Sequence, residues 1–175
     1  MIQPLDEIER WHKIKDPWKY ENSQDDQLRK HLLLSELPSK NYSRVLDIGC
    51  GQGFITRDLP GDSIIGVDVS SEAIKHAKKY EDERISFMQC SIFELNNKLH
   101  DKFDLIIITG VLYPQYIGDS LNLVYIIIDN LLKENGIIIS VHINSWYKAK
   151  FPYLLLTDYY YDYRDFTHKL EVYAK

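Results

Sequence analysis

The stretch from Val45 to Phe54, VLDIGCGQGF, joins a short apolar run directly to a turn with three alternating glycines. Glycine adopts positive φ angles without strain, and it lets a ligand approach main-chain N–H groups without meeting a Cβ atom. Such a turn between a strand and a helix is typical of the ligand-binding edge of a parallel α/β sheet. The stretch therefore predicts a fold class and also the place of a ligand.

The chain beyond this turn alternates short apolar segments with amphipathic ones, which predicts a parallel sheet covered by helices on both faces. We expect strands at Arg44–Gly49, Ser63–Val69, Ile85–Cys90, Phe103–Thr109 and Gly136–Ile143. We expect helices near Phe54–Leu59, Ser71–Tyr80 and Asp119–Lys133. The run Leu105–Ile108 has no polar alternation, as in a central strand buried on both sides. The expected fold class is α/β, with a Rossmann-like doubly wound sheet of five parallel strands.

Both ends of the chain depart from this alternation. The tyrosine-rich segments 159–163 and 169–173 lie too close together for a crossover helix, so we expect a C-terminal antiparallel hairpin. Near the other end, Ser23 is placed to cap a helix that runs to about Leu37, with leucines 28, 32 and 33 forming one apolar stripe. We expect a single domain over 1–175, made of an arm and helix (1–43) and a Rossmann-like core (44–175).

Composition narrows the class of partner. The chain has 21 Lys and Arg against 26 Asp and Glu, a formal charge of −5, which gives no general attraction to nucleic acid or to an anionic membrane. We therefore expect a small-molecule substrate and neither nucleic acid nor membrane as a partner. Two cysteines form no disulfide framework, and the start MIQPLDEIER lacks a secretion pattern, so we expect a cytoplasmic protein. The oligomeric state stays open.

Spacing around the glycines favours one kind of ligand. A dinucleotide fingerprint, G-x-G-x-x-G, needs a third glycine where Phe54 stands, so a pyrophosphate ligand is disfavoured. Asp47 lies just before the glycines, where a carboxylate attracts an ammonium group and repels a phosphate. Asp68 follows Gly49 by 19 residues, at the end of the next strand, where a carboxylate can bind both hydroxyls of a ribose. Its neighbour Val69 offers an apolar face to a base.

These residues carry a resemblance to a known family. Asp47, Gly49, Gly51 and Gly53 match the motif D/E-x-G-x-G-x-G in full, and the chain from 44 to 143 resembles the class I S-adenosylmethionine-dependent methyltransferases. The resemblance implies S-adenosylmethionine as cofactor, S-adenosylhomocysteine as product, and no metal. In that family the glycine loop, which here includes Cys50, holds the methionine part of the cofactor, and the acid after the second strand binds the ribose.

The resemblance also assigns cofactor contacts to the ends of the third and fourth strands. Family members often carry an aspartate after the third strand that faces the adenine amine, and this chain has Ser91 there. Main-chain N–H groups and stacking on Ile92 would then recognise the ring. Thr109, which ends the fourth strand, is assigned to the same site.

A shorter resemblance concerns the substrate. The chain lacks the [DN]-P-P-[YF] motif of base-amine methyltransferases, and it lacks carboxylates between 104 and 119 that would hold Mg²⁺. It is similar to nodulation-type N-methyltransferases and related sugar-modifying enzymes in Asp16-Pro17-Trp18 and in Val111-Leu112-Tyr113. This likeness implies that the arm, with Trp18, Tyr20 and Arg29, folds over the cofactor, and that Arg29 neutralises the methionine carboxylate. The alternative is that the tryptophans only pack the arm onto the sheet.

Methyl transfer to an amine or hydroxyl also requires the loss of a proton. The candidates for this catalytic role are His142, near the end of the fifth strand, and Tyr113, with His12 and His31 as further possibilities; a structural role is the alternative for each. We expect transfer of a methyl group to nitrogen or oxygen of a small molecule, with a sugar or sugar nucleotide as the leading acceptor. The alternatives are a protein or RNA methyltransferase and a non-catalytic S-adenosylmethionine-binding partner subunit.

Overall fold

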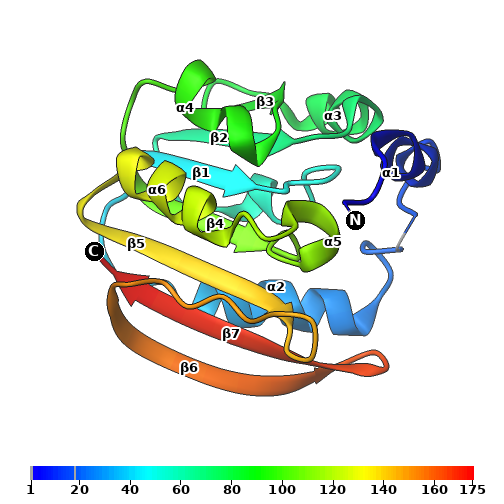
Figure 1. Ribbon diagram of the computed structural model, residues 1–175. Coiled ribbons are helices and arrows are strands. Elements are labelled where there is room, and N and C mark those ends of the chain that lie inside the picture. Colours follow the sequence, from blue (N-terminus) through cyan, green and yellow to red (C-terminus); the bar gives the residue numbers. More distant parts are fainter. Residues whose placement is uncertain (1, 18) are drawn as a thin grey trace.

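The fold is built on a seven-stranded sheet with the order β3-β2-β1-β4-β5-β7-β6 (Figure 1). The computed structural model describes residues 2–17 and 19–175. The strands are β1 (Arg44–Ile48), β2 (Ser63–Asp68), β3 (Ile85–Gln89), β4 (Phe103–Thr109), β5 (Leu132–Ile143), β6 (Leu154–Tyr163) and β7 (Phe166–Ala174). Strands β1 to β5 are parallel, and β7 runs antiparallel between β5 and β6. The expected parallel sheet with a C-terminal antiparallel hairpin is confirmed.

The register brings the residues that follow the central strands to one edge of the sheet. Ile48 of β1 pairs with Val67 of β2 on one side and with Ile108 of β4 on the other, and Thr109 of β4 pairs with Val141 of β5. Because the carboxyl ends of these strands are level, the turns after them meet above the same crevice. The antiparallel β7 brings its first residues to this edge as well.

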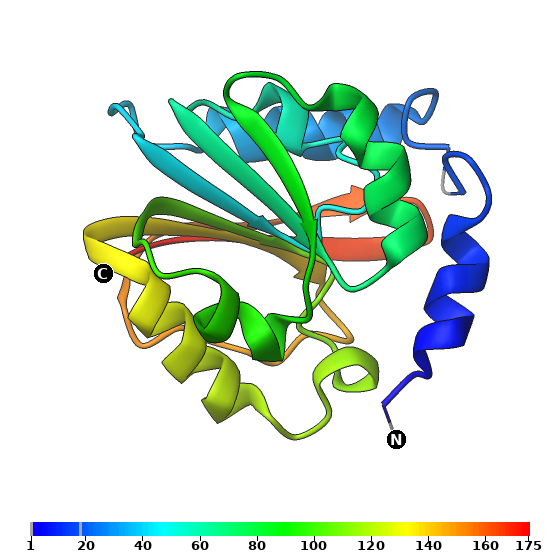
Figure 2. The same ribbon diagram turned by 90° about the horizontal axis from the view of Figure 1, so that it is seen from above.

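Helices and short helical turns cover both faces of the sheet (Figures 1 and 2). The helices are α1 (Leu5–His12), α2 (Gln24–Ser35), α3 (Ser71–Ala77), α4 (Leu95–Lys98), α5 (Pro114–Ile117) and α6 (Leu121–Leu131), with 3₁₀ turns at Thr56–Asp58, Lys78–Tyr80 and Ile92–Glu94. One apolar cluster joins α4 and α6 to the sheet, and a second joins α2 and α3 to its other face. The central strand β4 contributes to both, with Ile106 and Ile108 on one face and Leu105 and Ile107 on the other. Because both faces of β4 are buried, its sequence is a continuous apolar run.

Three expectations about individual elements are wrong. The expected helix at 54–59 is only a 3₁₀ turn, because the glycine loop closes with Gly53 N–H bonded to the Cys50 carbonyl and leaves few residues before Pro60. The expected helix at 119–133 ends at Leu131, and β5 begins at Leu132 rather than Gly136. The register explains the early start, because Leu132 pairs with Phe103 before the strand passes an irregularity.

The helix after Ser23 is confirmed, but its apolar stripe is only partly right. The Ser23 hydroxyl accepts the Asp26 N–H, as expected for a cap, and Leu33 is buried. Leu28, however, is 45% exposed, and the buried face instead carries Asp26 and Arg29. The β6–β7 hairpin supplies partners for this charged pair, a tertiary contact that the local leucine pattern does not contain.

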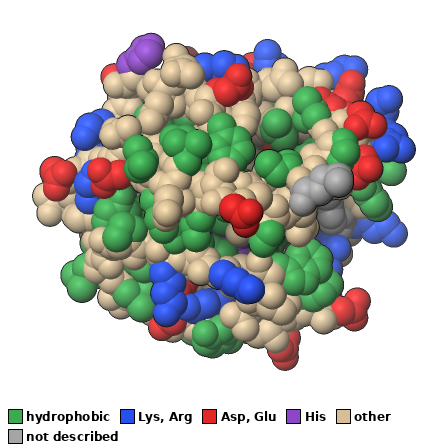
Figure 3. Space-filling view, viewed as in Figure 1, with side chains coloured by type: hydrophobic (Ala, Val, Ile, Leu, Met, Phe, Trp, Pro, Cys, Tyr) green, Lys and Arg blue, Asp and Glu red, His purple; other side chains and the backbone are tan. Residues whose placement is uncertain are grey.

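Within the expected arm, the structure adds a helix. Helix α1 begins after Pro4 and lies beside α3 at the carboxyl edge of the sheet (Figures 1 and 2). Among the described helices, none has a long enough apolar stretch to span a bilayer. On the face shown in Figure 3, basic and acidic side chains are interspersed among hydrophobic ones.

Candidate functional site

The glycine loop is held by the strand beside it. The N–H groups of Gly49 and Cys50 both donate to the Val67 carbonyl, at 2.8 and 3.0 Å, and the Gly51 N–H donates to Asp68 Oδ2 at 2.9 Å. The three glycines have φ angles of +78°, +53° and +83°, which side-chain-bearing residues adopt only with strain. The loop is therefore a fixed, left-handed turn tied to the end of β2.

The three glycines are needed for different reasons. A Cβ atom on Gly49 would lie 2.1 Å from Val111 Cγ2, and one on Gly53 would lie 2.9 Å from Phe87 Cζ, so packing excludes side chains at both positions. A Cβ atom on Gly51 would meet nothing within 4 Å in the described structure. Gly51 therefore borders open space, and its bare backbone can contact a ligand.

Asp68 lies where the sequence places the ribose contact. Its Oδ1 accepts the Ser70 N–H and its Oδ2 accepts the Gly51 N–H, both at 2.9 Å. Burial raises the pKa of this carboxyl, and the two N–H donors oppose the rise. A carboxylate has about four acceptor sites, so each oxygen retains capacity for a hydroxyl donor. Cys50 is buried beside it.

Asp47 presents a carboxylate oxygen that lacks a partner. It is 1% exposed, and its Oδ2 accepts the Thr56 hydroxyl at 2.6 Å. The other oxygen, Oδ1, is buried with no hydrogen-bond donor among the described residues. Burial raises the pKa of Asp47 to about 6, despite the opposing bond from Thr56. A buried, unpaired acceptor beside the glycine loop suits an ammonium group.

Arg29 presents a matching donor. The residue is 8% exposed, and its guanidinium pairs with Asp26 at 3.2 Å. The guanidinium carbon lies 5.1 Å from the Tyr20 ring centroid and 5.5 Å from that of Tyr163. Within the described part of the chain its Nε has no hydrogen-bond acceptor. The Arg29 charge also opposes the burial-raised pKa of Asp47, so the two groups lie within electrostatic reach of each other. An unpaired Asp47 oxygen and an unpaired Arg29 nitrogen together fit an α-amino acid, which carries both charges.

Asp26 ties this arginine to the hairpin. It is fully buried and accepts hydrogen bonds from the Tyr163 hydroxyl at 2.7 Å and from Arg164 Nη2 at 2.6 Å. The Asp26 carboxylate therefore joins helix α2 to the tip of the β6–β7 hairpin. Because Arg29 pairs with the same carboxylate, this junction holds the arginine in place. Sequence reasoning missed this role of Asp26, because its partners lie more than 130 residues away.

The arm lies against the glycine loop, and its folding over a cofactor stays a prediction. Asp16 N–H donates to the Gln52 Oε1 at 2.9 Å, and Gln52 Nε2 donates to the Ile14 carbonyl at 3.1 Å, so the arm is bonded directly to the glycine loop. Tyr20 stacks on Phe54 with ring centroids 5.4 Å apart. Trp18 lies outside the described residues, so its assignment to the cofactor stays a prediction.

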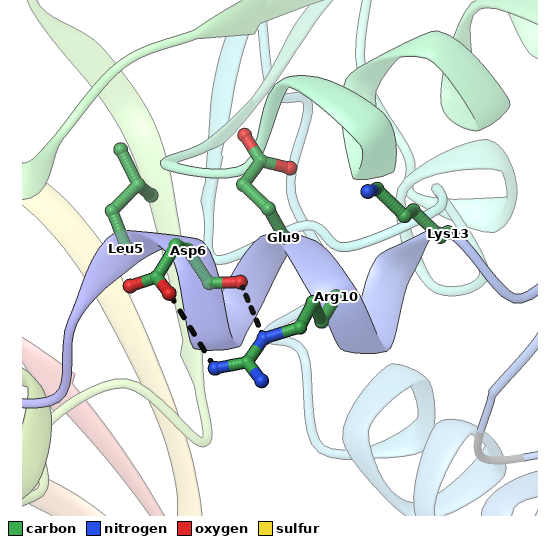
Figure 4. Close-up of a pocket in the computed structure, with 5 residues that line it drawn as sticks. All are labelled: Leu5, Asp6, Glu9, Arg10 and Lys13. Carbon is green, nitrogen blue, oxygen red and sulfur yellow. Dashed lines mark hydrogen bonds and ion pairs between the residues drawn. The ribbon is translucent and has the colours of Figure 1, made fainter.

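Glu9 fastens the arm at a second point. Its carboxylate accepts the Ser71 N–H at 2.8 Å, the Glu72 N–H at 3.1 Å and the Ser70 hydroxyl at 2.6 Å, and so caps α3 from another helix. Glu9, Asp6 and Arg10 all line a shallow pocket at α1, and in Figure 4 the Glu9 side chain extends from the helix away from the Asp6–Arg10 pair. These hydrogen bonds lower the pKa of Glu9 to about 2 against the effect of desolvation. Sequence reasoning missed Glu9, since no local pattern relates it to α3.

We expect Glu9→Gln to loosen the arm at neutral pH, because an amide replaces an acceptor-only carboxylate that faces four donors. Hydrogen exchange of main-chain amides at residues 2–16 should accelerate, whereas the matched change Glu7→Gln on the same helix should leave it unchanged. Since the folded pKa is depressed from 4.5 to about 2, the Glu9 contribution is present above pH 4.5 and is lost as the pH falls toward 2. Equal exchange rates in both variants would contradict the clasp.

The loop after β3 lies at the same edge. Ser91 caps the 3₁₀ turn at Ile92–Glu94, with its hydroxyl accepting the Phe93 N–H at 3.3 Å, and Ile92 is buried. The Cys90 N–H donates to the Asp68 carbonyl, and the Val69 carbonyl accepts Gln89 Nε2. Val69, Ser91 and Ile92 thus stand next to Asp68, and their contact with an adenine stays a prediction. Thr109 lies across the crevice, where its carbonyl borders Gly49.

His142 has a position that favours a structural role over the expected catalytic one. It is 0% exposed, its Nε2 accepts the Leu112 N–H at 3.1 Å, and its Nδ1 lies 3.0 Å from the Ser140 hydroxyl. Burial lowers the pKa of His142 to about 3. Both ring nitrogens are therefore engaged, and a group with this pKa is a weak base.

Tyr113 remains close to the crevice. Its hydroxyl accepts the Ile143 N–H at 2.7 Å, which leaves its own proton available, and burial raises its pKa to about 12. A phenol with this pKa is neutral near pH 7 and is not a base there, so a role of Tyr113 in the reaction stays a prediction. Of the other candidates, His12 is buried close enough to Asp68 for the two charges to interact, and His31 is exposed on α2.

Aromatic rings continue from Tyr113 to the rim of the crevice. Trp146 meets Tyr113 edge-on at 5.6 Å, and Phe166 meets Trp146 at 5.2 Å. Both outer rings are partly exposed. No cluster of three or more metal-ligating side chains occurs in residues 2–17 and 19–175.

Comparison with known proteins identifies the type of domain. Residues 39–167 match the family model described as a methyltransferase domain. The mitochondrial ubiquinone biosynthesis O-methyltransferase of Rattus norvegicus is 36% identical over 84 residues, which cover 42% of this chain and 24% of that protein. The corresponding protein of Rickettsia prowazekii is 25% identical across 95% of this chain and 73% of that protein. This chain thus spans about a quarter of the length of the rat relative.

Solved structures agree on the fold. The N-methyltransferase NodS from Bradyrhizobium japonicum, in complex with S-adenosyl-L-homocysteine, superposes with a TM-score of 0.81 at 23% identity, covering 98% of this chain and 97% of that one. A second crystal structure of NodS gives a TM-score of 0.76, and the match covers 89% of this chain. The expected likeness to nodulation-type enzymes is confirmed at the level of the fold.

Proposed function

The chain belongs to the methyltransferase-domain family and has the class I methyltransferase fold, and from this premise we propose that it transfers a methyl group from S-adenosylmethionine to a small-molecule acceptor. The observation that carries the proposal is the pair of buried, unpaired polar atoms at the edge of the sheet. Asp47 Oδ1 and Arg29 Nε suit the ammonium and the carboxylate of the methionine part. The motif at 47–53 supports the same placement.

The other residues of the crevice fit the rest of this cofactor. Gly51 offers bare backbone beside open space, Asp68 has acceptor capacity for ribose hydroxyls, and Ile92 offers an apolar surface for a base. When bound, S-adenosylmethionine supplies a methyl group on a positively charged sulfur, which is activated for displacement. The work of the protein is then alignment, through the fixed glycine loop on one side and the turn after β4 on the other.

The acceptor would meet the aromatic rings that lead from Tyr113 to Phe166. Their faces and edges suit a ring-shaped molecule, and a sugar or sugar nucleotide is the acceptor class that we propose. NodS is an N-methyltransferase and the rat relative is an O-methyltransferase by name, so either atom type is consistent with the family. Because His142 is engaged on both nitrogens, we propose that the acceptor proton leaves to solvent or to a separate basic group on the acceptor molecule.

Two measurements test the function. Calorimetry measures binding of S-adenosylhomocysteine and of NADH, and a single-turnover assay measures methyl transfer from S-adenosylmethionine to amines, phenols, sugar nucleotides, protein and RNA. We expect uptake of the sulfur nucleoside, no uptake of NADH, and transfer to one acceptor class. Firm binding of NADH alone would refute the proposal. Binding of the nucleoside without transfer to any acceptor, protein and RNA included, would support a non-catalytic partner subunit.

Asp68→Asn tests the ribose contact. The amide keeps one acceptor oxygen and places an NH₂ group against an N–H donor, so we expect S-adenosylhomocysteine binding to weaken by about 1.5–3 kcal/mol, the range for hydrogen bonds to a charged acceptor. Titration of the exposed Asp82→Asn variant serves as the control for charge. Adenine alone should bind both proteins equally. Unchanged affinity of Asp68→Asn for the full nucleoside would dismiss the ribose role.

A further inference from the structure

A chain of buried polar groups leads from β7 to the turn after β4. Glu171 is 1% exposed, and its Oε1 accepts the Lys169 ammonium at 2.6 Å and the Tyr173 hydroxyl at 2.8 Å. Burial raises the pKa of the Tyr147 hydroxyl, and the negative charge of Glu171 raises it further. The Tyr147 hydroxyl in turn lies 3.3 Å from that of Ser140. None of these residues takes part in the proposed cofactor site.

The same chain continues to the crevice. Ser140 lies 3.0 Å from His142 Nδ1, and the Leu112 N–H donates to His142 Nε2 at 3.1 Å. The His142 ring is also stacked on Tyr147, with centroids 4.3 Å apart. Leu112 lies between Val111, which fills the space beside Gly49, and Tyr113. The polar chain therefore ends on the segment that packs against the glycine loop.

The direction of the hydrogen bonds in this chain follows from its two ends. A main-chain N–H only donates, so His142 Nε2 must be without a proton, and Nδ1 then carries it and donates to Ser140. Ser140 donates to Tyr147, and Tyr147 must donate in turn to an acceptor. A carboxylate is an acceptor only, and Glu171, whose charge acts on Tyr147, can meet this requirement because its buried Oε2 has no hydrogen-bond partner in the described structure.

We propose that Glu171 is a positioning residue for the methyl-transfer site. It fixes the direction of the hydrogen bonds through Tyr147 and Ser140, and so holds His142 in the tautomer that accepts the Leu112 N–H. The inference rests on the proposed function only for its effect on cofactor affinity. The tautomer itself is a property of the protein without cofactor.

The replacement Glu171→Gln separates this role from simple packing. Lys169 and Tyr173 both donate to Oε1, so the amide oxygen stays there and the NH₂ group turns toward Tyr147. Tyr147 then donates to Ser140, Ser140 donates to Nδ1, and His142 carries its proton on Nε2, facing the Leu112 N–H. Two donors then oppose each other, and the Leu112 bond is lost.

The test is ¹⁵N NMR of histidine-labelled protein without cofactor, with His142 assigned by His142→Asn. We expect the Nδ1–H tautomer in the wild-type chain, a population of the Nε2–H tautomer in Glu171→Gln, and faster exchange of the Leu112 amide. The exposed change Glu134→Gln should alter neither. In Glu171→Gln/Tyr147→Phe the chain is interrupted, so the wild-type tautomer should return, which a purely structural role for Glu171 does not predict.

Cofactor affinity provides the functional readout. We expect S-adenosylhomocysteine to bind Glu171→Gln about fivefold more weakly, the effect of one lost hydrogen bond, and to regain affinity in the double variant. An Nε2–H tautomer in the wild-type chain would overturn the proposal even if Glu171→Gln does not fold. An unchanged tautomer in Glu171→Gln, or a reversed one that persists in the double variant, would also overturn it. If the wild-type chain binds no nucleoside, the proposed function fails while the tautomer result stands.

Discussion

Gly51→Val is expected to abolish binding of S-adenosylhomocysteine while the fold survives. The Gly51 backbone borders space in which a Cβ atom meets nothing within 4 Å, so the valine side chain would occupy the place of the ligand. We expect affinity to fall at least about 100-fold, since a steric block leaves no compensating contact. Isothermal calorimetry measures the affinity, and circular dichroism verifies the fold.

Backbone strain must be separated from this steric effect. Gly51 has a φ of +53°, where a side chain costs about 1–2 kcal/mol. Gly118, at the end of α5, has a φ of +56° and lies outside the glycine loop, and its Cβ atom would meet only the flexible Ile2 side chain at 3.4 Å. Because Gly118 also has a ψ of −134°, which side-chain-bearing residues rarely adopt, Gly118→Val should lose at least as much stability and still retain binding. A Gly51→Val protein that binds with wild-type affinity would refute close approach of the ligand to this backbone.

Asp47→Asn is expected to weaken cofactor binding and to stabilise the free protein. The substitution removes the buried charge for which we propose the methionine ammonium as the partner, and we expect a loss of about 1.5–3 kcal/mol in binding, roughly 10- to 100-fold. In the free protein the same charge is costly, because Asp47 Oδ1 is buried without a donor among the described residues. Calorimetry and urea unfolding measure the two effects.

The stability gain expected for Asp47→Asn should depend on pH. The pKa of Asp47 is raised from 3.8 to about 6, so between these values the folded protein binds more protons than the unfolded chain, and the free energy of unfolding falls as pH rises through this window. Above pH 6 the stability gain of Asp47→Asn reaches at most about 3 kcal/mol, two pKa units at 1.36 kcal/mol each. Below pH 4 the gain should vanish.

The exposed change Asp62→Asn removes one negative charge without altering a buried group, and serves as the control. It should leave both binding and the pH profile of stability unchanged. A stability gain that persists equally at pH 3.5 and 7 would show that the Asp47 charge is not the cause. Undiminished cofactor affinity in Asp47→Asn would reject the ammonium contact.

The cofactor half of the site follows closely from local sequence. Asp47, Gly51 and Asp68 lie at the ends of adjacent parallel strands. The alternation of apolar strands and amphipathic helices along the sequence is enough to predict that such ends meet at one edge of the sheet. Arg29 was proposed from a resemblance, and the structure places its guanidinium within electrostatic reach of Asp47. The cofactor contacts themselves stay predictions.

The residues expected to take part in catalysis could be predicted less well from the sequence. His142 stands at a strand end, where a histidine can face a ligand or the core, and strand periodicity does not tell which. The structure buries it fully, with one ring nitrogen bonded to Ser140 on the same strand and the other to Leu112 in the turn after the neighbouring strand β4. Sequence reasoning had no means to find the role that we propose for Glu171, because its partners come together only when β7 inserts beside β5.

The amino-acid sequence by itself determined the sheet, the glycine loop and the acids beside it, because hydrophobic period, glycine conformation and spacing act over a few residues. Only the tertiary structure decided which polar groups are buried, which of them have partners, and how the arm is fastened. The Glu9 clasp and the Asp26 junction join residues about 60 and 140 positions apart. Contacts at such separations depend on how finished elements pack, and burial then sets the pKa of Asp47 and of His142.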